Sequence, residues 1–407
     1  MANNNNKDKC NVPHLRFPEF SGEWKETTLG KIAEITKGSG ISKDQLSEQG
    51  SPCILYGELY TKYKSEIINE VYSRTELDSS PLVKSKANDV IIPCSGETAI
   101  DISTARCVLF NNILLGGDLN IIRLKYDDGG FFAYQLNGAR KKDIARVAQG
   151  VSVVHLYGEN LKQIRVYYPN IEEQRKITHL LSLIDGRIAT QNKIIEKYES
   201  LIKGLNDSLY AQYGDDVLTS FSSLGFSYSG LSGKSAQDFG SGKPFITYLN
   251  VYSNNIINEK DFQYVAIKEG EKQNVVEYGD VLFTLSSETP EEVGIGSVYL
   301  GNENVYLNSF CFGIHIINTK IAFPPYLSYY VSSTPFRKFI YPYAQGSTRF
   351  NLCKVDFEKA SIKLPSLENQ KRIYSILSHI ESKTETEKSL LDLYNSQKQY
   401  LLRQMFI

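Results

Sequence analysis

Several short runs of residues have types that suit phosphate or metal chemistry, but each one lacks a part that the chemistry needs. The run GLSGKS at residues 230–235 ends like a phosphate-binding P-loop, yet the first glycine of that motif falls on Tyr228, so a turn is the better interpretation. The five histidines are His14, His155, His179, His315 and His379. No two of them have the HxxxH or HExxH spacing of a metal site, so we expect none.

Two further runs would suit catalysis on nucleic acid. FPPY at residues 323–326 is similar to the NPPY signature of amino-methyltransferases, but Phe323 cannot replace the polar first residue that binds the reacting amino group. Glu97 and Glu288, each followed by threonine, recur at matching places and would each supply a carboxylate. No lysine or second acid stands at nuclease-like spacing from them, so a turn or helix-capping role is the better interpretation. The sequence therefore favours binding over catalysis.

Basic residues gather in stretches that read as turns. Clustered lysine and arginine side chains are candidates for phosphate contact, although scattered lysines usually form only a solvated surface. The net charge of −1 and the pI of about 6.6 do not indicate a nucleic-acid binder, but binding depends on a local basic face to which partner subunits can contribute. The candidate DNA-binding residues are Lys37, Lys43, Lys62, Lys64, Arg140, Lys141, Lys234, Lys243, Arg337 and Arg349.

An internal repeat organises the chain that must position these residues. PNIEEQRKI at residues 169–177 returns as PSLENQKRI at residues 365–373, within an ungapped match of residues 131–210 to residues 327–406. AQGVSVVHL, which begins at Ala148, likewise meets AQGSTRFNL. Upstream the match weakens. The period is far too long for a solenoid, so the chain reads as two duplicated domains, each followed by a duplicated segment.

The domain boundaries follow from this order. At 407 residues the chain exceeds what one hydrophobic core usually serves. Residues 21–168 and 213–364 contain short alternating apolar runs such as CILYGELY and PFITYLNVY, which predict mostly β domains, with helices near residues 131–143 and 326–338. Residues 1–20 are polar and predict a flexible tail. The fold class is therefore α+β, with residues 169–212 and 365–407 as two long spacer helices.

The two spacer helices have clear start signals. Pro169 with Asn170, and Pro365 with Ser366, place a capping side chain directly after a helix-breaking proline. Acidic residues follow in the first turn, where the helix dipole favours negative charge.

Apolar residues then recur alternately every four and three positions, which is the heptad period of a coiled coil. We expect the helices, each roughly 55 Å long, to pair antiparallel, although each could instead pack only on its own domain. Gln191, Thr384, Glu387 and Lys398 are polar seam positions that would fix the register. The apolar seam residues are Ile177, Leu181, Ile184, Ile188, Ile195, Tyr198, Ile373, Leu377, Ile380, Leu391, Tyr394 and Leu401.

This order resembles the specificity subunit of a type I restriction-modification system over nearly the whole chain. Each domain closes through AQG and leads into P-x-x-E-x-Q-[RK]-[RK]-I and a long helix. The first domain begins near W-x-x-x-x-LG, from Trp24 to Gly30. Residues 224–235 correspond loosely to residues 29–40, but Trp24 has no clear counterpart before Leu224, which leaves the start of the second domain open.

The resemblance implies that both domains are target recognition domains, each reading one half of a split double-stranded DNA sequence. It implies an antiparallel helical spacer that docks two methyltransferase subunits, through which the restriction subunits join. It further implies no catalytic residue and no cofactor in this chain, with S-adenosylmethionine, ATP and Mg²⁺ in the partner subunits. The docking residues that it implies at the helix starts are Glu172, Gln174, Arg175, Lys176, Glu368, Gln370, Lys371 and Arg372.

Two other functions stay open. One is a stand-alone DNA methyltransferase or nuclease, against which the absence of a glycine-rich cofactor loop weighs. The other is a coiled-coil scaffold that binds proteins only. No apolar run is long enough for a membrane span, and the polar start lacks the apolar stretch of a signal peptide, so we expect a cytoplasmic protein.

Overall fold

The computed structural model describes residues 11–214 and 216–407, and the chain divides into two compact units. The first unit comprises the chain up to Asn192 together with Ser389–Ile407, and the second comprises Lys193–Lys388. Each unit contains one mostly β domain and parts of two long helices, α7 (Ile171–Tyr213) and α13 (Leu367–Gln404).

The main sheets of the two domains have the same strand order. It is β2-β10-β6-β8 in the first domain, with β4 added beside β8, and β14-β21-β17-β19 in the second. All of these pairs are antiparallel except β4 with β8. The strands are β2 (Ala33–Lys37), β4 (Ile67–Ile68), β6 (Asp89–Pro93), β8 (Arg106–Val108), β10 (Leu119–Leu124), β14 (Gly225–Ser229), β17 (Val281–Thr284), β19 (Gly296–Val298) and β21 (Cys311–Ile316).

The smaller sheets repeat as well. A three-stranded sheet with one antiparallel and one parallel pair is β5-β3-β9 in the first domain and β16-β15-β20 in the second. β1 pairs with β12 as β13 pairs with β24, and β7 pairs with β11 as β18 pairs with β23. These strands are β1 (Lys25–Thr28), β3 (Ser51–Ile54), β5 (Ser73–Thr75), β7 (Ser95–Gly96), β9 (Leu114–Leu115), β11 (Val154–His155), β12 (Arg165–Tyr168), β13 (Val217–Thr219), β15 (Phe239–Ile246), β16 (Gln263–Val265), β18 (Ser286–Ser287), β20 (Tyr306–Leu307), β22 (Ala344–Gln345), β23 (Phe350–Leu352) and β24 (Ile362–Leu364).

Short helices occupy equivalent places in the two domains. The α-helices are α1 (Leu29–Ile32), α2 (Glu58–Thr61), α3 (Ala99–Ile102), α4 (Gly129–Asn137), α5 (Lys141–Val147) and α6 (Gly158–Lys162) in the first domain, and α8 (Phe221–Leu224), α9 (Tyr248–Ser253), α10 (Pro324–Tyr330), α11 (Thr334–Ile340) and α12 (Lys354–Lys359) in the second. The 3₁₀ helices are η1 (Lys43–Gln45), η2 (Ala236–Asp238), η3 (Glu259–Asp261), η4 (Pro290–Glu292) and η5 (Tyr341–Tyr343).

Some predicted elements differ from the structure. The helix predicted near residues 131–143 is two helices, because the chain leaves the helical conformation at Gly138. Its counterpart near residues 326–338 is also broken, because Ser333 caps a new helix that has proline in its first turn. The runs CILYGELY and PFITYLNVY begin as strands but end as α2 and α9, since Thr247, for example, accepts a hydrogen bond from the backbone of Asn250 and starts a helix.

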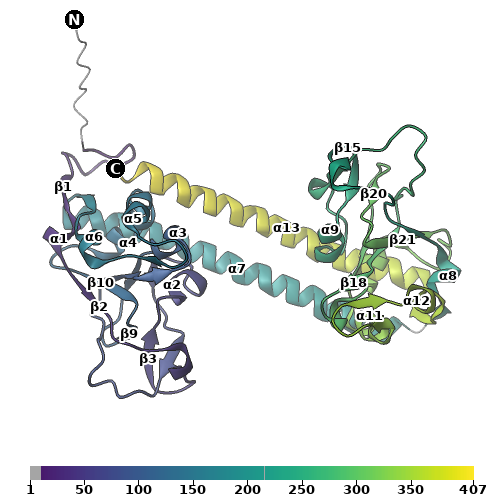
Figure 1. Cartoon of the computed structure of the whole chain (residues 1–407), viewed down its shortest axis with the longest axis horizontal. Coiled ribbons are helices and arrows are strands. Elements are labelled where there is room, and N and C mark those ends of the chain that lie inside the picture. The colour runs from purple at the N-terminus through teal and green to yellow at the C-terminus, as the bar shows by residue number, and fades with distance from the viewer. Residues whose placement is uncertain (1–10, 215) are drawn as a thin grey trace, which may run out of the picture. The chain divides into compact units, whose positions relative to one another are not determined.

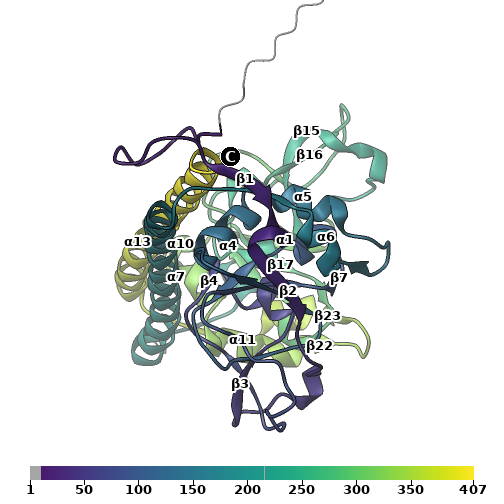
Figure 2. The same cartoon turned by 90° about the vertical axis from the view of Figure 1, so that its left-hand side faces the viewer.

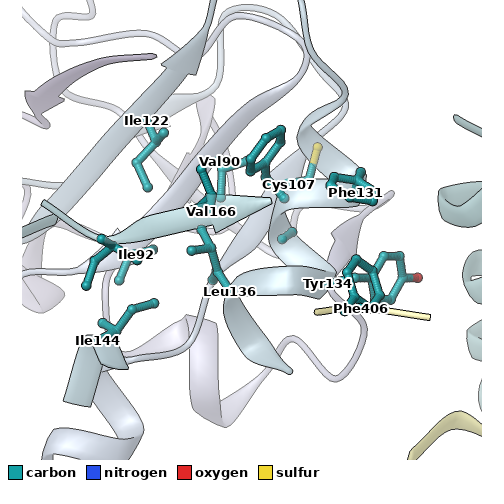
Figure 3. Close-up of a cluster of buried hydrophobic side chains, with 14 of the residues drawn as sticks. Val90, Ile92, Cys107, Ile122, Phe131, Tyr134, Leu136, Ile144, Val166 and Phe406 are labelled. Atoms are coloured by element: carbon teal, nitrogen blue, oxygen red, sulfur yellow. The ribbon is translucent and has the colours of Figure 1, made fainter. Parts of the chain in front are cut away.

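The core of the first unit lies between its main sheet and α4. Every residue of β6 is buried, because both faces of this central strand are covered. Phe131 and Phe132 of α4 are fully buried, and Phe406 from the end of the chain packs edge-to-face against Trp24. Figure 3 shows Val90 and Ile92 of β6, Phe131 and Leu136 of α4 and Phe406 in one cluster of buried side chains.

Helix α4 joins the sheet to α7. It packs on β6 and β8 with one face, and the hydroxyl of Tyr134 donates a hydrogen bond of 2.7 Å to Asp185 of α7. Figure 2 shows α4 between α7 and β2. The helix therefore fixes the main sheet of the first domain to α7.

The two long helices run antiparallel within each unit (Figure 1). In the first unit, Ile177 near the start of α7 shares a core with Leu401 near the end of α13. In the second unit, Ile202 near the end of α7 shares a core with Ile373 near the start of α13. All twelve predicted apolar seam residues are buried or half-buried, so the coiled-coil prediction is confirmed, although much of the seam also packs on the β domains.

The start of the second domain becomes clear from equivalent elements. Helix α8 stands where α1 stands, so Leu29 corresponds to Phe221 rather than to Leu224. The sequence comparison missed this because only a Leu-Gly pair matched. Asp216 then occupies the place of Trp24, in front of the first strand of the domain.

Residues 11–20 are not the flexible tail that we predicted, and residues 1–10 of that tail lie outside the described part of the chain. The backbone N–H of Leu15 donates to the carbonyl of Gln404 at 2.9 Å, and Phe17 packs on the core of the first unit. The guanidinium of Arg16 donates two hydrogen bonds of 2.7 Å to Glu173. A buried carboxylate and an aromatic contact therefore order this segment, which its polar composition did not indicate.

Candidate nucleic-acid interface

In the first domain, loops at one edge of the sheets surround an open cavity of about 990 Å³. The loop after β2, helix α2 and the turn before β10 line it. Tyr56 and Tyr60 contribute aromatic rings, and Lys43 and Lys62 contribute ammonium groups. Aromatic rings beside cations suit nucleic acid, because rings stack on bases while cations meet phosphates. This cavity is the candidate interface of the first domain.

A buried carboxylate holds α2 in place at this cavity. Glu58 accepts hydrogen bonds from the backbone N–H of Leu55 at 2.9 Å, from Lys62 at 2.6 Å and from the hydroxyl of Ser73. Burial, with the nearby carboxylate of Glu58 second, raises the pKa of the Cys53 thiol to about 11, so that thiol stays protonated at neutral pH. Lys62 is therefore committed in part to the fold, whereas Lys43 makes no ion pair with any described residue.

In the second domain, aromatic rings and an arginine gather at the equivalent edge. Tyr248 and Tyr252 of α9 stack with their ring centroids 6.0 Å apart, and the guanidinium of Arg349 lies 6.0 Å from the centroid of Phe310. Burial raises the pKa of Tyr248, and the positive charge of Arg349 opposes the rise. Phe310 is 56% exposed and Leu249, which follows Tyr248 in α9, is 69% exposed, so this group faces solvent.

The ten predicted DNA-binding residues fall into two groups. Lys37, Lys43 and Lys243 are exposed and pair with no described acid, and Lys64 is exposed and donates to the carbonyl of its neighbour Thr61. Lys43, Lys62 and Arg349 lie at the two loop edges described above. These exposed residues stay candidates for DNA contact.

The other group is held within the protein. Lys234 is paired with Glu271 at 2.5 Å, and this contact is the main cause that lowers the pKa of Glu271 to about 2. The guanidinium of Arg337 donates to three backbone carbonyls, each at 2.7 Å, and burial lowers its pKa. Both side chains stabilise loops. Sequence could not distinguish them from free cations, because their partners come from distant loops.

Arg140 and Lys141 lie at the start of α5 and are also half-buried. Arg140 is paired with Asp143 at 3.2 Å, donates to the carbonyl of Ile407 and lies over the ring of Tyr167. Burial, with the nearby positive charge of Arg106 second, lowers the pKa of Lys141. Arg140 thus fastens the end of the chain to the first domain.

The glutamine of the repeated motif has the same structural role in both units. Gln174 donates to Asp127 at 2.8 Å and to the carbonyl of Pro169 at 2.9 Å, and its oxygen accepts from the backbone of Asp128. Gln370 donates to the carbonyls of Ile321 and Pro365 at 2.7 and 2.9 Å and accepts from the backbone of Phe323. Each glutamine ties its helix to the loop before α4 or α10.

This finding corrects the predicted docking surface. Gln174 and Gln370 are fully buried and cannot meet a partner subunit, because all their polar atoms satisfy the fold. Lys176 is exposed but pairs with Glu19 and lies 4.5 Å from the ring centroid of Phe17. The predicted docking residues that are exposed and make no ion pair with any described residue are Glu172, Arg175, Glu368, Lys371 and Arg372.

The third residue of each long helix links it to the strand that opens its domain. Trp24 donates its indole N–H to Glu173 at 3.3 Å, and Asp216 accepts from the side chain of Asn369 at 3.1 Å and from the backbone of Ser366 at 2.8 Å. Trp24 and Asp216 occupy equivalent places in the two domains. An indole donates to a carboxylate at the first place and an amide donates to a carboxylate at the second, so the residues at these places differ although both hold the long helix. Sequence identity therefore could not reveal that Trp24 and Asp216 are equivalent.

A buried charge cluster fixes α13 to the first domain. The ammonium of Lys398 lies 2.5 Å from Glu66 of the domain and 2.6 Å from Asp185 of α7. Asp185 also accepts hydrogen bonds from Ser65 and Tyr134. Burial alone would lower the pKa of Lys398, but the two carboxylates outweigh it and raise the pKa above its ordinary value. The polar seam position predicted to fix register therefore joins three elements.

In residues 11–214 and 216–407, no group of three or more His, Cys, Asp and Glu side chains is arranged to hold a metal ion. No helix among the residues that the structure describes is both long enough and apolar enough to cross a membrane.

Comparison with known proteins gives one family and a shared fold. The family model described as "Type I restriction modification DNA specificity domain" matches residues 21–200 and 232–393. The structure is similar to the crystal structure of a type I restriction-modification S subunit from M. genitalium, with a TM-score of 0.59 at 16% identity, covering 97% of this chain and 99% of that one. A structure solved to explain complex assembly and conformational transition of the type I R-M system gives a TM-score of 0.57 at 15% identity, covering 96% of this chain and 98% of that one.

Proposed function

The chain belongs to the family of the type I restriction modification DNA specificity domain, and on that basis we propose that it reads a bipartite DNA sequence, one half-site with each domain. The duplication supports this proposal most strongly, because the family model matches twice and both domains have the same order of strands and helices. Two equivalent domains that differ at their exposed loop edges suit two different half-sites.

We further propose that this subunit directs partner subunits and performs no catalysis itself. Two methyltransferase subunits would dock on the long helices, with restriction subunits joining through them, and S-adenosylmethionine, ATP and Mg²⁺ would bind in those partners. The exposed charged residues at the two helix starts, such as Arg175 and Arg372, suit a docking role, because no described acid neutralises them.

A domain exchange tests the two-reader proposal. Residues 213–364 would be replaced by the corresponding domain of another family member, in a host that supplies the methyltransferase subunit. We expect one half of the methylated motif to change and the other half to persist. Loss or alteration of both halves in a complex that still assembles would contradict separate readers.

The stand-alone enzyme and the protein scaffold make different predictions. The purified chain, incubated with DNA, S-adenosylmethionine and Mg²⁺, should neither methylate nor cut the DNA without its partners. Activity of the chain alone would favour an enzyme. Failure to bind any DNA, even with the methyltransferase subunit present, would favour a scaffold that binds only proteins.

A further inference from the structure

Both domains contain the same tight turn shortly before their last short helix. Gln149 and His155 exchange backbone hydrogen bonds of 2.9 and 2.7 Å, which close a turn of residues 150–154, and we call residues 150–153 the first tip. Gln345 pairs with Asn351 and closes a turn of residues 346–350, of which we call residues 346–349 the second tip. The two turns come from the aligned runs AQGVSVVHL and AQGSTRFNL.

A glycine makes each turn tight. Gly150 has a φ of 117° and Gly346 a φ of 139°, a conformation that other residues rarely adopt. A Cβ added at Gly150 would lie 2.1 Å from the carbonyl oxygen of Val153, and one added at Gly346 would lie 2.1 Å from that of Arg349. The repeat therefore keeps a fixed backbone at both tips.

Two of the three side chains on this shared backbone differ in chemistry between the tips, while Ser152 and Thr348 both carry a hydroxyl group. The first tip carries Val151 and Val153, which are 99% and 53% exposed. Neither valine belongs to the hydrophobic core of the first unit. The second tip carries Ser347, Thr348 and Arg349, all exposed. The flanking Leu156 and Leu352 are buried in both domains, so the anchor is shared and only the tip changes.

The chemistry of the tips suits base edges better than the DNA backbone. A valine methyl group cannot bind phosphate, but it packs well against the methyl group of thymine in the major groove. An arginine in fixed geometry donates two hydrogen bonds to guanine, and the ring of Phe310 beside Arg349 helps to orient its guanidinium. A tight turn also helps binding, because a mobile loop would have to be ordered on the DNA, and that ordering would weaken the binding.

We propose that the two tips are specificity-determining elements: Val151 and Val153 read a base pair containing thymine in one half-site, and Arg349 reads a guanine in the other. This inference rests on the proposed function, and it adds the residues and the chemistry of reading. A tip that contacts only phosphate would change affinity for all sequences alike.

The test uses the full chain with its methyltransferase subunit and compares methylated motifs by methylome sequencing. The variant Arg349→Ala should relax one position in one half-site, with discrimination at that position falling about tenfold or more. The combined variant Val151→Ser, Ser152→Thr and Val153→Arg should alter only the other half-site. Tyr126→Ser, at a residue that is 89% exposed outside both tips, is the matched control and should keep the motif.

Three outcomes would overturn the inference. They are an unchanged motif for both tip variants, an altered motif for the control, and methylation reduced equally at all sites with the motif intact. If a variant abolishes methylation in cells, binding of its purified complex to duplexes that differ by one base pair decides: equal loss on every duplex also overturns the inference. The unsubstituted chain must first give a bipartite motif, since its absence would instead refute the proposed function.

Discussion

The glutamine of the repeated motif shows how a residue that looks like a docking site can be structural. Gln174 and Gln370 each connect a proline carbonyl, the first turn of a long helix and the loop before α4 or α10. The recurrence of the glutamine was visible in the sequence. Its hydrogen-bond partners were not visible, because partners such as Asp127 and Phe323 lie 47 positions away along the chain. The neighbouring exposed charges could be predicted, since helix periodicity alone places them.

Replacing this glutamine should destabilise the first unit. Gln174→Met would leave the partly buried backbone N–H of Asp128 and the carbonyl of Pro169 without their side-chain partner, at a cost of about 1–3 kcal/mol in the free energy of unfolding. Trp24 is the only tryptophan and lies in the first unit, so its fluorescence in urea reports this change. Gln397→Met, at an exposed position on α13, is the control. Equal midpoints for the two variants would refute the structural role.

Lys398 makes the free energy of unfolding of the first unit depend on pH in the alkaline range. Lys398→Met leaves Glu66 and Asp185 buried without a cation, which should cost roughly 3–5 kcal/mol at neutral pH. Since the folded pKa of Lys398 is raised, its contribution is complete below the ordinary value of 10.5 and is lost as the pH rises through the folded value.

The difference in unfolding free energy between the native chain and Lys398→Met should therefore stay constant from about pH 7 to pH 9 and shrink above about pH 10.5. Titrations that the two proteins share cancel in this difference. A difference that grows with alkaline pH would contradict the assignment.

At the scale of elements, the long helices were the most predictable part of the molecule. Their starts follow from proline and capping residues, and their seam follows from the heptad period, so α7 begins at Ile171 as the sequence indicates. Short helices such as α2 and α9 were missed, because four to six residues carry no helical period and their caps decide the conformation. The loop edges built on them were missed for the same reason.

The cap of α7 can be tested directly. Asn170 accepts a hydrogen bond of 2.9 Å from the backbone N–H of Glu173. Asn170→Ala should lower the free energy of unfolding of the first unit by about 1 kcal/mol, while Asn170→Ser should nearly restore it, because serine is also a good cap. Urea unfolding followed by Trp24 fluorescence measures both variants. Equal losses for alanine and serine would show that the cap contributes nothing.

At the scale of the whole molecule, duplication was the decisive signal. The same strand order recurs in two domains whose sequences have diverged, and the link made by Trp24 in one domain is made by Asp216 in the other. Sequence comparison found the repeat where residues were retained, at the helix starts and on either side of the tips. Sequence comparison could not align the starts of the two domains, because a hydrogen bond to the long helix recurs there but is made by different residues, Trp24 and Asp216.

Methylome sequencing of a host that carries the methyltransferase partner, with and without this chain, tests the central claim most directly. The account predicts one additional methylated motif when the chain is present, made of two specific half-sites separated by a fixed number of unspecified base pairs. An identical methylome in the two strains, with the methyltransferase partner shown to be active, would contradict the claim that this chain reads DNA.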